Sequence, residues 1–160
     1  TYTQVRPDQP AREVFDLMQS RAADHGIALA LEAPGDLGPI RMDPEGIHRC
    51  LLNLITNAVD ACVASDPGQG AQRITLSVDQ AADGSVTYRV SDTCCGMDEK
   101  TRSRLFQRFF TTKGERGTGI GLMLTRTIVH RHNGRIDVDS QPGKGSCFSI
   151  HLPGNGGRSV

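Results

Sequence analysis

The 160-residue chain predicts an α+β fold of two layers, in which helices cover one face of a mainly antiparallel sheet. Three stretches carry apolar residues at helical spacing, and five short stretches alternate apolar and polar residues as half-buried strands do. Four of the strand-like stretches form two pairs, each joined by a short turn-forming segment. Because a hairpin joins antiparallel neighbours, these pairs indicate a mainly antiparallel sheet.

The helices are placed by their apolar stripes and by the signals at their ends. Gly26 is a stop signal after the first helix. Asp43 is a natural N-cap for the second helix, and Pro44 suits its first position, where no backbone N–H is needed. The predicted helices, including one short helix, are Ala11–His25, Pro44–Ser65, Asp98–Phe106 and Leu122–His132.

The strands and loops complete one domain without an internal repeat. Residues 111–121 are rich in glycine and threonine, which predicts a mobile loop. We expect a lead-in with no periodic pattern over residues 1–10, the domain over 11–153 and a flexible tail over 154–160. The predicted strands are Ile27–Leu31, Ile74–Val78, Val86–Val90, Ile136–Val138 and Phe148–Leu152.

The composition excludes several classes of function. Lys and Arg number 18, as do Asp and Glu, so no net charge favours nucleic acid or an anionic membrane. No apolar run approaches the roughly 20 residues of a membrane-spanning helix. We therefore expect a cytoplasmic chain, which leaves open whether a longer parent is membrane-anchored. The five cysteines show neither a secreted disulfide framework nor zinc-ligand spacing, so we expect reduced thiols.

Two asparagines stand out in the second predicted helix. Asn53 and Asn57 are four residues apart and share one face, which Arg49 and Asp60 extend as a polar stripe. One interpretation is an ordinary solvated face. The other is a metal site, because asparagine is a poor helix former and its amide oxygen is a suitable ligand for Mg²⁺.

Three further segments carry candidate chemistry. Asp92 ends a strand, where its carboxylate either accepts a hydrogen bond from an exocyclic amine such as that of adenine or simply caps a turn. The glycine-rich run Gly117–Leu122 opens a helix, so it either presents amides to phosphate or is a plain flexible loop. Arg108 and Lys113 lie just before it and either reach phosphates or are surface cations. Gly143–Phe148 reads as an ordinary hairpin turn.

The order of these motifs resembles the Bergerat (GHKL) ATP-binding domain of sensor histidine kinases. The resemblance covers about residues 10–153, and the FFTTK wording at 109–113 is closest to the nitrogen-regulation branch, which has a short ATP lid. The segments Asn53–Ala61, Asp92–Met97, Leu105–Lys113, Gly117–Leu122 and Gly143–Phe148 resemble the N box, first glycine box, F box, second glycine box and last glycine box, respectively.

The resemblance implies ATP and Mg²⁺ as cofactors and assigns roles to single residues. Asn57, assisted by Asn53, holds Mg²⁺ on the phosphates, and Asp92 reads the adenine amine. Lys113 and Arg108 meet the phosphates, so these two cations and the two asparagines are the implied catalytic residues. The further nucleotide contacts implied are Asp60, Gly96, Met97, Gly117, Thr118, Gly119, Ile120, Gly121, Leu122 and Ser146.

One position departs from the family pattern. Cys94 replaces the first glycine of the usual DxGxG box, so a β-carbon could crowd the turn or the nucleotide if positive φ is needed there. This departure supports an alternative function, a degenerate nucleotide-binding regulatory domain without catalysis. The adjacent Cys94-Cys95 pair is expected to be buried and inert rather than redox-reactive.

Asn53 also favours phosphotransfer to histidine over hydrolysis. Related ATPases carry glutamate at this position as a general base for water or a hydroxyl, and an amide cannot be a base. A neutral imidazole needs no such base. None of the five histidines has the sequence context of a phosphoacceptor. The resemblance therefore implies that the acceptor lies on a separate histidine-containing dimerisation domain, through which a response regulator is reached. It also implies that the isolated domain is a monomer with little activity alone.

Overall fold

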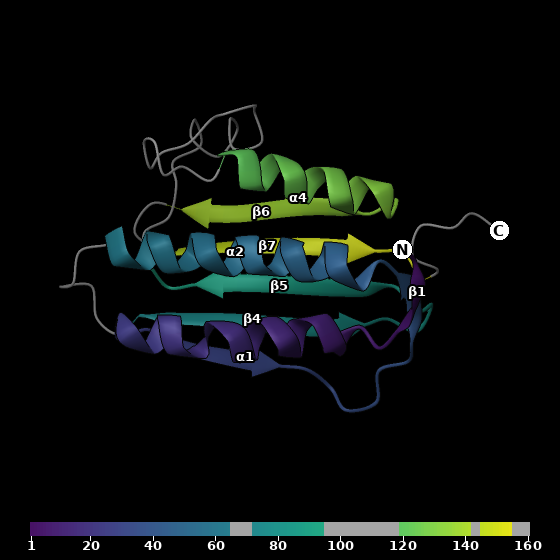
Figure 1. Cartoon of the computed structure of the whole chain (residues 1–160), viewed down its shortest axis with the longest axis horizontal. Helices are drawn as coiled ribbons and strands as arrows, with labels where there is room; N and C mark the ends of the chain where they lie inside the picture. Colours follow the sequence, from purple (N-terminus) through teal and green to yellow (C-terminus); the bar gives the residue numbers. More distant parts are fainter. Residues whose placement is uncertain (65–71, 95–118, 142–144, 155–160) are drawn as a thin grey trace.

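The computed structural model describes residues 1–64, 72–94, 119–141 and 145–154 and has two layers. Helices α1 (Asp8–Asp24), α2 (Pro44–Ala64) and α4 (Gly119–Arg131) lie side by side over one face of a sheet (Figure 1). The α+β class with helices on one face is thus confirmed.

The main sheet has five strands in the order β2-β4-β5-β7-β6. β2 pairs with β4 in parallel, because α2 lies between them in the chain and returns it to the same end, and every other neighbouring pair is antiparallel. The sheet is therefore mixed but mostly antiparallel, as predicted. Its strands are β2 (Ala28–Glu32), β4 (Arg73–Gln80), β5 (Val86–Asp92), β6 (Arg135–Gln141) and β7 (Gly145–Leu152).

Three features differ from the sequence prediction. β1 (Thr3–Val5) and β3 (Ile40–Met42) form a two-stranded antiparallel sheet that was not predicted. Three residues are too few for an alternating pattern to be read. Helix α1 begins at Asp8, inside the predicted lead-in, and α4 begins at Gly119, inside the predicted loop. Glycine has a low intrinsic helix propensity, but the packing of the helical residues that follow overrides this preference.

The core lies between the two layers. β4 and β5 bury every second residue against the helices, and Tyr88 is among the largest fully buried side chains. The apolar stripe of α2 packs onto these strands. This burial fixes the rotation of α2 and leaves its opposite, polar face outside the core. The stripe consists of Ile47, Cys50, Leu51, Leu54, Ile55, Ala58, Val59 and Cys62.

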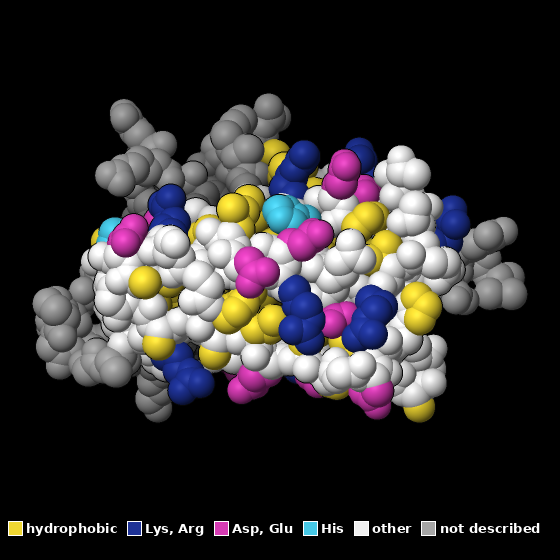
Figure 2. Space-filling model, turned by 60° about the horizontal axis from the view of Figure 1, so that its bottom comes forward, with side chains coloured by type: hydrophobic (Ala, Val, Ile, Leu, Met, Phe, Trp, Pro, Cys, Tyr) yellow, Lys and Arg dark blue, Asp and Glu magenta, His cyan; other side chains and the backbone are white. Residues whose placement is uncertain are grey.

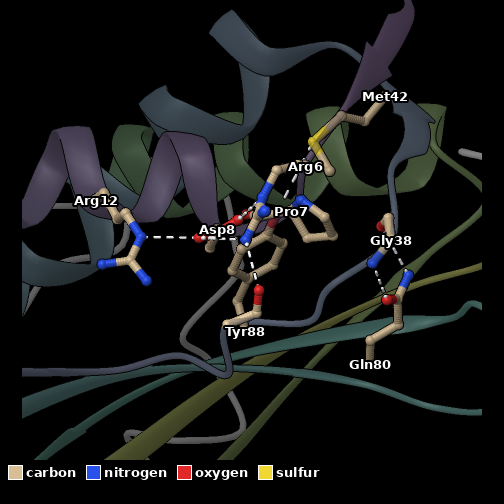
Figure 3. Close-up of polar contacts among 9 residues, drawn as sticks. Arg6, Pro7, Asp8, Arg12, Gly38, Met42, Gln80 and Tyr88 are labelled. Carbon is tan, nitrogen blue, oxygen red and sulfur yellow. Dashed lines mark hydrogen bonds and ion pairs between the residues drawn. The ribbon is translucent and has the colours of Figure 1, made fainter.

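Polar contacts fasten the start of α1 to the sheet (Figure 3). The buried Tyr88 hydroxyl donates to the carbonyl oxygen of Pro7 over 2.6 Å. The buried Asp8 carboxylate accepts from Arg6 at 3.1 Å and from Arg12 at 2.8 Å. Burial raises the pKa of Asp8, but the hydrogen bonds from Arg12 and Arg6 outweigh it and hold that pKa below its ordinary value.

Among the described residues on the face shown in Figure 2, basic and acidic side chains are interspersed and form no extended patch of one charge. This distribution agrees with the zero formal net charge. Among the helices described, none combines the length and the apolar character needed to cross a bilayer.

Candidate functional site

The described candidate residues gather at one end of the molecule. The C-terminal half of α2, the last residue of β5, the first residues of β7 and the first turn of α4 all lie at the left in Figure 1. Their proximity follows from contacts that cross between elements. β5 pairs with β7 up to Asp92 and Ser146, and the side chain of Asn53 on α2 reaches Thr125 on α4.

Asp92 is buried and is the last residue of β5, the central strand of the sheet. Its register partners are Ile74 on β4 and Ser146 on β7. One carboxylate oxygen, Oδ1, accepts the backbone N–H of Cys94 over 3.0 Å, so Asp92 does cap the turn that follows it. The capping bond fixes the carboxylate, and Asp92 and Ser146 both line a cavity of about 280 Å³. Turn capping and ligand recognition are therefore compatible here.

Gly145 lies beside Asp92 in the candidate site, and the sequence prediction did not single it out. Its φ is +92°, and a β-carbon there would overlap the carbonyl oxygen of Asp92 and lie 3.1 Å from the Cα of Thr93. Only glycine allows β7 to approach the end of β5 this closely. The next residue, Ser146, is held by a 2.8 Å hydrogen bond between its hydroxyl and that of Ser140. The signal in the sequence is the Gly-Lys-Gly turn, which the resemblance places in the last glycine box and which otherwise predicts an ordinary hairpin turn.

The polar face of α2 makes contacts with both neighbouring helices. Asn53 Nδ2 donates to the Thr125 hydroxyl of α4 at 3.4 Å. Asp60 faces α1, with 4.0 Å between its carboxylate and the guanidinium of Arg21. Asn57 is half-buried on the same stripe. Thr125 is fully buried, and an isolated threonine in a helix gives no sequence signal for this role.

Cys94 does not need the conformation of the glycine it replaces. Among the described non-glycine residues, Asn133 has a positive φ and Cys94 does not. Instead of crowding the turn, its side chain forms a disulfide with Cys62 of α2. The prediction of reduced thiols throughout is therefore wrong for this pair, because two cysteines 32 residues apart give no connectivity from sequence alone. Cys50 remains a buried free thiol, and burial raises its pKa to about 12.

Several candidates lie outside the described residues: Gly96, Met97, Arg108, Lys113, Gly117 and Thr118. The short predicted helix and the predicted mobile loop up to residue 118 also lie there. Gly119, Ile120 and Gly121 form the first turn of α4, whose backbone N–H groups have no acceptor within the helix. Leu122 is buried in the core.

Comparison with known proteins identifies the family. The family described as "Histidine kinase-, DNA gyrase B-, and HSP90-like ATPase" matches residues 42–156. The chain belongs to this ATPase family. The match spans α2, β5, α4 and β7, the elements that carry the candidate site, and it confirms the resemblance to the GHKL superfamily. Assignment to the nitrogen-regulation branch stays a prediction.

Relatives of this ATPase domain are sensor histidine kinases. The chain is 36% identical over 155 residues to the sensor histidine kinase ZraS of Klebsiella oxytoca and 33% identical over 154 residues to the histidine-protein kinase AtoS of Escherichia coli. These alignments cover 97% and 96% of the chain but 32% and 24% of the two relatives. The chain thus corresponds to about a third or less of their length.

Solved structures of histidine kinases share the fold. The nucleotide-free catalytic domain of ThkA matches with a TM-score of 0.81 and 25% identity, over 97% of this chain and 99% of that one. Full-length ShkA in complex with AMPPNP matches with a TM-score of 0.82 and 27% identity, over 96% of this chain and 31% of ShkA. The chain therefore has the fold of a histidine kinase catalytic domain.

Proposed function

We propose that this domain binds Mg·ATP and transfers the γ-phosphoryl group to a histidine on a separate dimerisation domain, as one step of two-component signalling. The observation that carries the proposal is the fixed Asp92 carboxylate beside Ser146 at the cavity edge. Its support from outside the chain is the ATPase family itself and the sensor histidine kinases among the relatives.

Asp92 has the properties of an adenine reader. It is buried, it ends a central strand, and its orientation is set by the N–H of Cys94. A carboxylate in such a place accepts a hydrogen bond from the exocyclic amine of adenine. Guanine carries a carbonyl oxygen at that position, so acceptor would face acceptor and no hydrogen bond would form. Leaving a buried acceptor unpaired is costly, which gives selectivity for the base.

Phosphate and metal are assigned to the helices. The first turn of α4 offers backbone amides at the positive end of the helix dipole, which favours an anion. The amide oxygens of Asn53 and Asn57 fit the preference of Mg²⁺ for hard oxygen ligands, and Thr125 orients the first of them. Bound Mg²⁺ would neutralise negative charge on the phosphates. Lys113 and Arg108 complete the proposed phosphate contacts.

Histidine is the proposed acceptor because the site lacks a base at position 53. A hydroxyl or water must lose a proton as it attacks phosphorus, and the amide of Asn53 cannot take it. A neutral imidazole nitrogen attacks without prior deprotonation. We also propose that the domain works in the cytoplasm, with the response regulator reached through the phosphohistidine, and that it is monomeric when isolated.

The test is a binding measurement followed by a transfer assay. The chain is titrated with ADP and with a non-hydrolysable ATP analogue by calorimetry, with and without Mg²⁺. It is then mixed with radiolabelled ATP and a purified histidine-containing dimerisation domain. Micromolar binding and acid-labile label on the acceptor are the expected results. Binding without transfer would favour the regulatory alternative, and no binding would contradict the proposal.

A further inference from the structure

A disulfide between Cys62 and Cys94 joins the end of α2 to the chain just after β5. The two Cα atoms are 4.9 Å apart, within the usual range of about 4.4–6.8 Å for disulfides. The two sulfur atoms and a carboxylate oxygen of Asp92 all lie within 4.8 Å of one another. The disulfide is thus in the immediate surroundings of the carboxylate assigned to adenine.

We propose that this cysteine pair is a redox switch on the nucleotide site. The disulfide form binds adenine nucleotides more tightly than the dithiol form. The inference rests on the proposed function, because it requires Asp92 to contact the base. The modification site is the pair Cys62 and Cys94, and its reactant is a small-molecule thiol or disulfide.

The disulfide acts on Asp92 through the backbone of Cys94. The N–H of Cys94 donates to Asp92 Oδ1 over 3.0 Å, so any displacement of Cys94 loosens the carboxylate. Cys62 is the more firmly held partner: it belongs to α2, and its carbonyl oxygen accepts from Gln72 Nε2 over 2.6 Å. Cys94 follows the last strand residue and lies outside any helix or strand.

Reduction therefore displaces Cys94 rather than Cys62. Bonded sulfurs are about 2 Å apart, whereas non-bonded heavy atoms keep roughly 3.5–4 Å. Both side chains are 1% exposed, so the thiols have little room to separate without a shift of the chain. Thr93 resists this shift, because its N–H and hydroxyl are both hydrogen-bonded to the backbone of Arg73. The movement therefore falls on Cys94, whose N–H donates to the Asp92 carboxylate.

The position of the pair in the fold provides access for exchange. Cys62 lies two residues before the end of α2 at Ala64, beside Val63, which is 53% exposed. Cys94 lies two residues beyond the end of β5. Element ends open locally at low cost, so a buried pair placed there can meet a small thiol or disulfide without global unfolding.

The exchange with oxidised glutathione balances as follows. The thiolate of one cysteine attacks a sulfur of glutathione disulfide, which forms a mixed disulfide and releases one glutathione thiolate. The thiolate of the other cysteine then displaces the second glutathione. Two electrons pass from the cysteine pair to glutathione disulfide, and the two protons lost by the cysteines go to the two glutathione thiols.

The experiment compares the whole chain after equilibration in oxidised and in reduced glutathione. Disulfide mapping by mass spectrometry establishes which cysteines are paired, and calorimetry gives the dissociation constant of ADP in each state. We expect binding to the dithiol form to be about threefold to tenfold weaker, the ratio that the ordering of one or two side chains produces. The variant Cys62→Ala should bind like the reduced chain in both buffers.

Cys50→Ala is the matched control, because it removes another buried α2 thiol that lies outside the pair. It should keep the redox response. Equal dissociation constants in both states, a redox response in Cys62→Ala, or mapping of Cys62 to a different cysteine would each overturn the inference while leaving the proposed function intact. Absence of ADP binding in both states would overturn the proposed function, and this inference with it.

Discussion

At the scale of single residues, the site depends on where one carboxylate points. Asp92 is buried, capped by the N–H of Cys94 and placed opposite Ser146. We predict that Asp92→Asn weakens ATP binding and narrows the preference for ATP over GTP. The amide oxygen of an asparagine can still accept the N–H of Cys94. Its NH₂ group would then face the adenine amine, donor against donor. Calorimetric titration with both nucleotides measures the ratio.

Asp139→Asn is the control for this experiment. Asp139 lines the same cavity but is exposed. Its substitution therefore removes one negative charge, as in Asp92→Asn, but does not alter a buried acceptor. It should leave the ATP-to-GTP ratio unchanged. If Asp92→Asn also left the ratio unchanged, Asp92 would have no part in recognising the base.

Gly145 provides a second prediction at this scale. In Gly145→Ala, the new β-carbon would overlap the Asp92 carbonyl at a φ of +92°, so β7 must move away from the end of β5. The free energy of unfolding should fall by about 1–3 kcal/mol, and nucleotide affinity should fall with it. Gly35→Ala is the control, since a β-carbon there meets nothing within 4 Å. Equal effects in urea denaturation of the two variants would contradict the close approach.

At the scale of elements, the sequence was most informative where an apolar pattern was long. The stripe of α2 and the alternation of β4 and β5 were read correctly because each spans several periods. β1 and β3 have three residues each and depend on pairing with one another, which no local pattern reveals. The start of α1 was missed because Pro7 and Pro10 obscure its first turn, although proline is tolerated there.

In the candidate site, too, residues within sequence motifs were predicted, whereas residues that depend on long-range contacts were not. Asp92 and Ser146 were predicted from motifs, and their direct pairing follows from the antiparallel register of β5 with β7. Thr125, Gly145 and the disulfide partner Cys62 were not predicted as site residues. Each of these three acts through a contact between distant segments, and such contacts are set by tertiary packing rather than by spacing along the chain.

The start of α1 gives a prediction about pH. The folded-state pKa of Asp8 is lowered, so the stability it contributes is present above its ordinary pKa and is lost as pH falls through the folded value. Asp8→Asn should lower the free energy of unfolding at pH 7 by about 1–3 kcal/mol, because Arg6 and Arg12 lose a charged acceptor. Between about pH 5 and pH 2 the wild type should lose more stability than the variant.

Asp79→Asn is the control for the Asp8 experiment. Asp79 also accepts from an arginine, Arg89, over 3.0 Å, but its side chain is 63% exposed. Solvent screens such a pair, so its substitution should change stability by less than about 1 kcal/mol. Chemical denaturation across the pH range gives the free energy of unfolding of each protein. If that free energy varied with pH in both variants as it does in the wild type, Asp8 would not have this role.

At the scale of the whole molecule, the fold places one layer of helices so that their ends and the ends of the strands meet. α2 contributes the asparagines and Cys62, β5 contributes Asp92, and α4 contributes a helix start. The chain covers about a third or less of the length of its curated relatives. The proposed nucleotide site can be tested on this domain alone.

The disulfide should also contribute to the stability of the fold. The Cys62–Cys94 disulfide closes a loop with a sequence separation of 32 that includes β4 and β5, so it restricts the unfolded chain as well as the site. Reduction should lower the free energy of unfolding by about 2–4 kcal/mol. Urea denaturation without nucleotide measures this difference, and Cys62→Ala, already lacking the bridge, should lose nothing further on reduction. Cys50→Ala should lose as much on reduction as the wild type. An unchanged unfolding midpoint for the reduced wild type would mean that the disulfide does not constrain the chain.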